Sequence, residues 1–156
     1  MERKLELYEY TGNLAYGLFG WHTEGHLCKI DVKFVKNNGL RLGNYKPILR
    51  PLSDLCKPII HNGKKEVSIV ELAKIAFPEL LWEFNHSRAW SGTSAHELVY
   101  NGIEKAFVAW KLGFKISVPN QYQLFDYLHS RFIDYRGLID AGLAISVYDL
   151  EQNPYV

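Results

Sequence analysis

Three side chains of types that bind metal ions lie close together near the start of the sequence. If residues 23–25 form the loop of a hairpin, His22 and His26 face each other across it. Cys28 then lies on the same face as His26, and imidazole and thiolate are both ligands of Zn²⁺. However, Cys28 shares its strand face with Ile30, Val32 and Phe34, which predicts a buried thiol, and the sequence offers no evident fourth ligand. We therefore expect no metal and no cofactor.

The catalytic motifs of several enzyme classes are incomplete in this sequence. His96-Glu97 begins like the helix motif of zinc metalloproteases, but Tyr100 occupies the position of the second histidine. Ser53 and Ser91 lack the Gly-x-Ser-x-Gly turn that exposes a nucleophilic serine. The glycines near the N-terminus do not form a phosphate-binding loop. We therefore assign no catalytic residue and favour a non-enzymatic protein.

The segment from Trp82 to Trp90 combines aromatic side chains with a cation. Trp82, Arg88 and Trp90 could stack on a base, on another ring or on a peptide partner. The alternative is structural, because aromatic residues in an irregular segment commonly anchor that segment to the core. The binding interpretation requires Trp82 or Trp90 to be exposed.

Basic residues are concentrated in one part of the chain. Residues 29–65 hold nine Lys or Arg and two Asp, a charge of +7, whereas the whole chain has a net charge of +1. The candidate anion-binding residues are Lys29, Lys33, Lys36 and Arg41. Such a surface would bind nucleic acid with a steep dependence on salt. Alternatively, the same residues form the solvated face of a sheet.

The length and composition are those of one folded domain spanning residues 1–156. Apolar residues make up 47% of the chain and charged residues 22%, so a packed core should form without disulfides. The two cysteines lack the spacing of a disulfide scaffold, and the first residues lack an apolar signal segment, which predicts a cytoplasmic location. No apolar run approaches the ~20 residues that cross a bilayer, so we expect no membrane partner.

The first sixty residues predict an antiparallel β-meander. Leu14–Trp21 and Cys28–Phe34 have strand patterns, and the second alternates apolar with charged residues. A turn at 37–39 leads to strands at 40–42 and 45–49. Prolines make the segment from Lys46 to Ile60 an expected edge strand and extended connection, because proline cannot donate to a sheet ladder. A turn is predicted after it, at His61-Asn62-Gly63.

The remainder, from residue 66 to 156, predicts mixed helices and strands, and the whole chain is therefore assigned to the α+β class. Ser68 and Glu71 have the spacing of a capping box at the start of a helix. Residues 82–102 are predicted to be an irregular loop. Strands are predicted at 106–111, 114–118 and 143–148, and a helix from 120 to 139 buries one apolar face. That face contains Leu124, Leu128, Phe132, Tyr135 and Ile139, and the opposite face contains Gln123, Asp126, Ser130 and Asp134.

Two segments carry a resemblance to other proteins. They are Lys46-Pro-Ile-Leu-Arg-Pro-Leu-Ser-Asp-Leu55 and Gly137-Leu-Ile-Asp-Ala-Gly-Leu-Ala-Ile145, together with the predicted helix before the second. This chain resembles a group of small phage and prophage proteins of gut anaerobic bacteria, for which no activity is established. The resemblance implies a bacterial host cytoplasm, and it does not extend over residues 79–118.

Three hypotheses for function follow from these observations. The first is a non-enzymatic accessory or protein-interaction module of phage type, which binds another protein through residues 82–102 or an exposed sheet edge. The second is a nucleic-acid-associated module that uses the basic 29–65 segment. The third, a small hydrolase or metal enzyme, would need a pocket that unites distant histidines such as His86, His96 and His129. The sequence predicts no particular oligomeric state.

Overall fold

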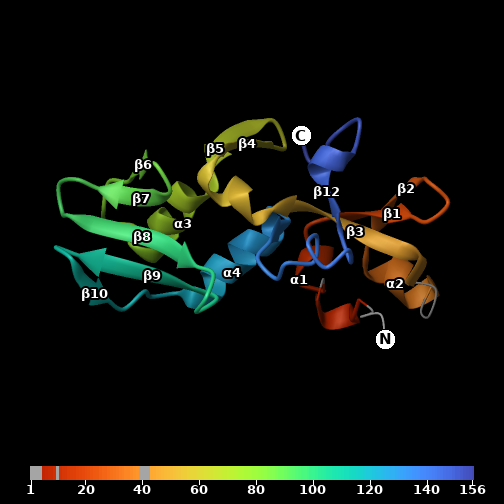
Figure 1. Cartoon of the computed structure of the whole chain (residues 1–156), viewed down its shortest axis with the longest axis horizontal. Coiled ribbons are helices and arrows are strands. Elements are labelled where there is room, and N and C mark those ends of the chain that lie inside the picture. The colour runs from red at the N-terminus through yellow and green to blue at the C-terminus, as the bar shows by residue number, and fades with distance from the viewer. Residues whose placement is uncertain (1–4, 10, 39–42) are drawn as a thin grey trace. The chain divides into compact units, whose positions relative to one another are not determined.

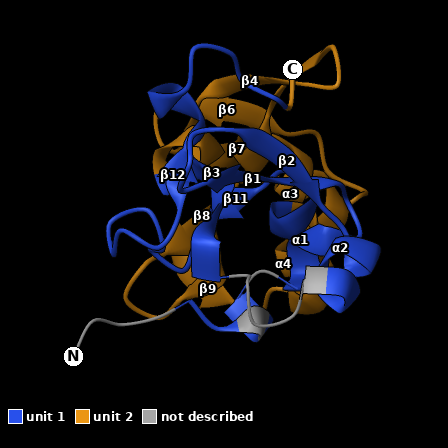
Figure 2. Cartoon of the chain, turned by 90° about the vertical axis from the view of Figure 1, so that its right-hand side faces the viewer, with its two compact units in different colours: residues 1–52, 128–154 blue, residues 53–127, 155–156 orange. Residues whose placement is uncertain are grey.

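The computed structural model describes residues 5–9, 11–38 and 43–156 (Figure 1). It contains helices and mainly antiparallel sheets, which confirms the predicted α+β class. The chain divides into two compact units (Figure 2). Unit 1 comprises residues 1–52 and 128–154, and unit 2 comprises residues 53–127 and 155–156. The single domain predicted over residues 1–156 remains a prediction.

Unit 1 is built on a mixed sheet with the strand order β11-β3-β1-β2, and β12 also pairs with β3. β1 is antiparallel to β2 and β3, as predicted for the N-terminal meander, whereas β11 and β12 are parallel to β3. Its elements are η1 (Leu7–Glu9), α1 (Thr11–Leu14), β1 (Leu18–His22), β2 (Leu27–Ile30), α2 (Val32–Asn38), β3 (Tyr45–Pro51), β11 (Ile133–Asp134), β12 (Ile145–Ser146) and η4 (Val147–Asp149).

The strand predicted from Cys28 to Phe34 is wrong in its second half. β2 ends at Ile30, and Asp31 starts the helix α2 in place of continuing the strand. The Asp31 carboxylate accepts a hydrogen bond of 2.7 Å from the Phe34 amide, and its carbonyl accepts one of 3.0 Å from the Val35 amide. This is the contact pattern of a helix N-cap, which aspartate favours. The turn predicted at 37–39 lies partly outside the described residues, and the strand predicted at 40–42 lies wholly outside them.

Two other boundaries near the N-terminus differ from the prediction. The strand expected to start at Leu14 begins at Leu18, because residues 11–14 form the short helix α1. β3 was expected to lie at a sheet edge, yet it is central. Its neighbours pair with successive parts of it: β1 with residues 45–47, β12 with 48–49 and β11 with 50–51. Arg50, between the prolines, donates its amide to the Phe132 carbonyl at 2.7 Å, so the prolines do not prevent pairing.

The helix predicted from 120 to 139 ends much earlier. α4 spans Gln121–Ser130, and Phe132 then adopts a left-handed backbone with φ of +58°. The next two residues pair with β3 as β11, so sheet formation replaces further helix. Leu124, Leu128 and Phe132 are buried as predicted, at 0%, 0% and 1% exposure. The strand expected at 143–148 is also shorter, because η4 follows β12 directly.

Asp134 holds the chain after β11 in place. Its side chain is buried, and its two carboxylate oxygens accept hydrogen bonds from the Leu138 amide at 2.9 Å and the Ile139 amide at 2.8 Å. It was predicted to lie on the exposed side of a longer helix, and that prediction is wrong. The carboxylate satisfies two backbone donors in a turn that contains Gly137 at φ of +74°.

Replacing Asp134 by alanine should lower the free energy of unfolding by about 0.5–2 kcal/mol, as the loss of a side-chain cap does. Chemical denaturation of the two proteins measures the difference. Asp140→Ala, at an exposed aspartate in the same segment, is the control and should change stability by less than about 0.5 kcal/mol. Equal effects at both positions would show that the Asp134 hydrogen bonds contribute nothing specific.

Unit 2 contains a two-stranded hairpin and a five-stranded antiparallel sheet with the order β10-β9-β8-β7-β6 (left in Figure 1). The hairpin turns at Asn62-Gly63, as predicted, with φ of +48° and +76°. The elements are β4 (Pro58–His61), β5 (Lys64–Val67), α3 (Ser68–Ala76), β6 (Glu83–Asn85), β7 (Arg88–Ser91), β8 (His96–Asn101), β9 (Ala106–Lys111) and β10 (Phe114–Ile116). η3 (Leu52–Cys56) and α4 begin in one unit and end in the other.

Residues 82–102 are a sheet and not the irregular loop that was predicted. Three of the five strands, β6, β7 and β8, lie in this segment. His86 and Ser87 form the turn between β6 and β7, with His86 at φ of +58°. Histidine is not a typical turn residue, so the sequence provided little indication of the hairpin formed by β6 and β7. The strand predicted at 106–111 is confirmed as β9, and the one predicted at 114–118 ends at Ile116 as β10.

The helix α3 packs on one face of the five-stranded sheet. Ala89, Leu98 and Ala109 form a row across β7, β8 and β9 on that face, and all three are fully buried. α3 contacts β7 and β8 from that side. The capping box predicted at Ser68 is wrong: the residue before the helix is Val67, and Ser68 Oγ is buried with no hydrogen-bond partner among the described residues.

No helix in the described part of the chain is both long enough and apolar enough to cross a membrane.

Candidate functional site

The face of the five-stranded sheet opposite the buried Ala89 row carries a line of aromatic and charged residues. Strand pairing aligns one residue from each strand, in the order Glu83, Trp90, Glu97, Trp110 and Lys115. Directly paired residues project from the same face of a sheet, so these five side chains lie side by side. The two tryptophans are half-buried and therefore partly open to solvent.

A second row next to this line adds polar and apolar groups. Asn85 pairs with Arg88, and Val99 follows Glu97 by two residues on the same side of β8. We call the combined surface the tryptophan face, defined by Asn85, Arg88, Trp90, Glu97, Val99 and Trp110. Its members come from four adjacent strands, so their spacing is fixed by the backbone ladder.

An ion pair lies at the centre of the tryptophan face. The Arg88 guanidinium donates to the Glu97 carboxylate at 2.6 Å, and its central carbon lies 5.7 Å from the ring centroid of Trp90. The two side chains are 40% and 27% exposed. An ion pair this open to water contributes little to stability, less than about 1 kcal/mol. Its main effect is to hold the cation in one orientation beside the indole ring.

A recess of about 460 Å³ opens on this face. This volume lies within the ~300–1,000 Å³ range of ligand sites. The lining combines the ion pair with an indole, amide and hydroxyl groups and an imidazole. The lining residues are Asn85, His86, Ser87, Arg88, Glu97, Val99, Trp110 and Gly113. Polar groups thus converge around an apolar wall.

The three residues predicted to bind a partner do not all lie together. Arg88 and Trp90 are on the tryptophan face. Trp82 is buried, with 8% exposure, its Nε1 donates to the Phe77 carbonyl at 3.2 Å, and its ring packs against Phe77. Trp82 therefore anchors its segment to the core of unit 2 and is not open to a partner. Sequence reasoning missed Glu97 and Trp110, which join Arg88 and Trp90 only through the strand register.

The candidate anion-binding residues are distributed over two sides of unit 1. Lys29 is opposite Phe19, on the face of the sheet that also carries Trp21 and Lys46. α2 covers the other face, because its Phe34 packs edge-on against Tyr45 at 4.9 Å. The exposed Lys33 and Lys36 belong to α2. Arg41 lies outside the described residues.

The other basic residues of the 29–65 segment are buried or belong to the other unit. Arg50 is buried, with 2% exposure. Lys57, Lys64 and Lys65 belong to unit 2. Within unit 1, the described basic residues therefore do not form one face, and nucleic-acid binding remains a prediction without further support from the geometry.

The histidines proposed for a metal enzyme occupy different surroundings. His86 lines the recess, whereas His96 is on the α3 side of the sheet, buried and 5.8 Å from the ring of Phe77. His129 belongs to unit 1 and its Nε2 contacts the Tyr135 hydroxyl at 2.8 Å. In the described parts of the chain, one group of His, Cys, Asp or Glu side chains is close enough to share an ion, and it is His22, Glu24 and His26.

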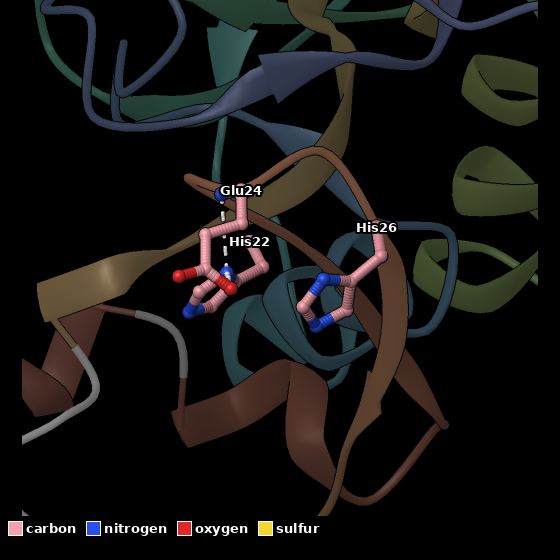
Figure 3. A group of neighbouring side chains, drawn as sticks. All are labelled: His22, Glu24 and His26. Atoms are coloured by element: carbon pink, nitrogen blue, oxygen red, sulfur yellow. Dashed lines mark hydrogen bonds and ion pairs between the residues drawn. The ribbon is translucent and has the colours of Figure 1, made fainter.

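This histidine cluster lies on the β1–β2 hairpin (Figure 3). The rings of His22 and His26 stack with centroids 4.5 Å apart and planes at 23°. Glu24 contributes a carboxylate oxygen 3.7 Å from Nδ1 of His22, and its amide donates to the same nitrogen at 3.1 Å. Figure 3 shows the three side chains gathered on one side of the hairpin. The sequence predicted the facing histidines but not the part of Glu24.

Neither cysteine is an evident metal ligand. The Cys28 thiol donates to the Gly20 carbonyl at 3.5 Å, and burial raises the pKa of Cys28 above its ordinary value. The Cys56 thiol donates to the Ser87 carbonyl at 3.2 Å, and burial raises the pKa of Cys56 as well. Because the thiolate is the form that binds metal, both shifts oppose metal binding at neutral pH.

A second recess, of about 680 Å³, lies in unit 1 and joins apolar side chains to the C-terminal segment. Trp21, Leu27 and Ile145 form its apolar part, and the remaining lining residues are Asp149, Leu150, Glu151 and Gln152. Its ionisable groups are all acidic. It therefore lacks the paired cation and carboxylate that orient groups on the tryptophan face.

Comparisons of the chain with protein-family models, with curated proteins and with solved structures found no match. The fold and the open face define an α+β protein whose second unit presents a preorganised aromatic and charged surface.

Proposed function

We propose that this chain is a non-enzymatic protein-interaction module that binds another protein through the tryptophan face. The observation that carries the proposal is the strand register, which places Trp90 and Trp110 on either side of Glu97, with Arg88 paired to that carboxylate. Tryptophan and arginine are the residues that most often dominate binding energy at protein interfaces.

The charge arrangement of the face also favours a protein partner. The centres of protein interfaces are depleted of charged residues, except where a charge is paired. Arg88 and Glu97 neutralise each other at 2.6 Å, so a partner can cover them without burying a free charge. Nucleic acid would instead require uncompensated cations for its phosphates.

The recess defines what the partner must present. An apolar side chain can fill the space beside Trp110 and Val99, and polar backbone or side-chain groups can meet Asn85 and Arg88. Both tryptophans are already held in a rigid sheet, so little side-chain entropy is lost on binding. We infer a partner segment with a protruding apolar residue flanked by hydrogen-bonding groups.

The ionisable groups around the recess favour binding over catalysis. Arg88 is paired with Glu97, and the His86 ring contacts the Asn85 side-chain oxygen. A catalytic acid or base is expected to face an open position where a substrate proton can be transferred. The resemblance to phage and prophage proteins supports an accessory role in the cytoplasm of a bacterial host, and this context is part of the proposal.

The proposal is tested by capture of partners from the organism that carries this chain. The wild-type chain and three variants, Trp90→Ala, Trp110→Ala and Tyr122→Ala, are immobilised and incubated with the same lysate. Tyr122 is the matched control, because it is an aromatic residue of unit 2 with 83% exposure that lies on α4 and not on the tryptophan face. Circular dichroism verifies that each variant is folded.

We expect one specific protein to be recovered by the wild type and by Tyr122→Ala, and to be lost from both tryptophan variants. Recovery of the same protein by all four chains would place the interaction elsewhere on the molecule. Repeated absence of any partner, together with turnover in an activity screen, would contradict the proposal.

A further inference from the structure

We propose that His22, Glu24 and His26 form a binding site for a divalent transition-metal ion, with Zn²⁺ as the probe ion. This inference is independent of the tryptophan face, because the three residues belong to the β1–β2 hairpin of unit 1. The three ligand atoms lie within 4.8 Å of one another.

The hairpin fixes two of the ligands before any ion binds. His22 and His26 face each other at its end, where the His22 amide donates to the His26 carbonyl at 2.9 Å. Gly25, at φ of +89°, allows the chain to reverse between them, and its amide donates to the His22 carbonyl at 2.9 Å. The backbone therefore keeps the two imidazoles side by side.

His22 is also held from the side of α2. Its ring lies 4.6 Å from that of Tyr45, which in turn packs against Phe34. The side chain of His22 is only 12% exposed. One imidazole is thus restrained by packing, whereas Glu24, with 80% exposure, is free to adjust to an ion.

The hydrogen bond that His22 accepts identifies Nδ1 as the nitrogen that carries a lone pair. Nδ1 accepts from the Glu24 amide at 3.1 Å, which assigns the ring proton to Nε2. An ion can take the place of this amide at Nδ1. The amide lies in an exposed loop, so water can satisfy it after the exchange.

The distances require only a small contraction. Bonds of ~2.0–2.1 Å to a tetrahedral Zn²⁺ place two ligand atoms about 3.3 Å apart. Nδ1 of His22 and the Glu24 carboxylate oxygen are already 3.7 Å apart. The longest distance between two of the ligand atoms is at most 4.8 Å, so it must shorten by up to about 1.5 Å. Movement of the exposed side chains of Glu24 and His26 can supply this change.

The ligand set selects the class of ion. Two imidazoles and one carboxylate suit Zn²⁺, Cu²⁺ and Ni²⁺ better than Mg²⁺ or Ca²⁺, which prefer oxygen ligands. Three protein ligands leave a fourth position for water or for a group from a partner. The sequence suggested His22, His26 and Cys28 as ligands but predicted no metal, because the thiol was expected to be buried. In the hairpin, the third potential ligand is Glu24 and not Cys28.

Isothermal titration calorimetry with ZnCl₂ tests the site. The full chain, without a histidine tag, is first stripped with chelator and dialysed. His26→Ala and Glu24→Gln remove exposed ligands and should leave folding intact. His61→Ala is the matched control, because it removes an imidazole from β4 in unit 2.

We expect one Zn²⁺ per wild-type chain and unchanged binding in His61→Ala. Loss of a partner that only orients a ligand weakens metal affinity ~10–100-fold. Glu24→Gln should therefore weaken binding by at least about 10-fold and His26→Ala by at least about 100-fold. Absence of zinc binding by the wild type, or equal binding by wild type and His26→Ala, would overturn the proposal.

Discussion

Replacing Leu128 by alanine is expected to lower the free energy of unfolding by about 2–5 kcal/mol. Leu128 has 0% exposure and lies near the end of α4. The substitution removes buried apolar surface and leaves a cavity that the surrounding side chains fill only in part. Urea denaturation followed by circular dichroism measures the loss.

Gln123→Ala is the control for Leu128. Gln123 is exposed on the same helix, and alanine is a good helix former, so its effect should stay within about 0.5 kcal/mol. Equal, small losses at both positions would show that the buried face of α4 is misassigned.

Gly12→Ala should lower the free energy of unfolding by about 1–3 kcal/mol, because there is no space for a methyl group. A β-carbon at Gly12 would lie 2.4 Å from Nδ1 and 2.5 Å from Cε1 of His129. The His129 ring cannot move away without cost: Nε2 contacts the Tyr135 hydroxyl at 2.8 Å, and the His129 carbonyl accepts from Asn13 at 2.9 Å.

A tyrosine hydroxyl keeps its proton at neutral pH, and burial raises the pKa of Tyr135 further above its ordinary value. The contact that restrains His129 therefore persists through the usual range of stability measurements. Gly102→Ala provides the control, since a β-carbon there meets no atom within 4 Å. It should be neutral or stabilising by up to ~1 kcal/mol. A Gly12→Ala protein as stable as the Gly102→Ala protein would contradict the packing of His129 against α1.

The sequence predicted those elements whose signals are local. The Asn62-Gly63 turn has the residues that a tight hairpin requires, and β9 contains a continuous apolar run from Ala106 to Trp110. α2 was missed because Val32 and Phe34 fit the alternation of a strand as well as they fit a short helix. The Asp31 side chain decides between them by capping the helix, and aspartate before an apolar residue was the available signal.

Longer-range effects were not predictable from one segment. α4 ends because the residues that follow it pair with β3, more than eighty residues earlier in the chain. β3 accepts three partners in succession, so its prolines did not place it at an edge. In each case tertiary pairing overrode a local preference.

Only part of the candidate site was predicted from the sequence. Arg88 and Trp90 were named because they lie close together in sequence. Glu97 and Trp110 come from the next two strands, and only the strand register brings them beside Trp90. Trp82 looked equivalent to Trp90 in sequence, yet it lies outside the strands and fills the space next to Phe77.

The dissociation constant of the captured partner tests the central claim most directly. It is measured with the purified partner against wild type, Trp110→Ala and Tyr122→Ala under one set of conditions. Removal of a dominant interface tryptophan costs at least ~2 kcal/mol, so Trp110→Ala should bind about 30-fold more weakly or worse. Tyr122→Ala should bind as the wild type does. Wild-type affinity in Trp110→Ala would show that the tryptophan face does not contact the partner.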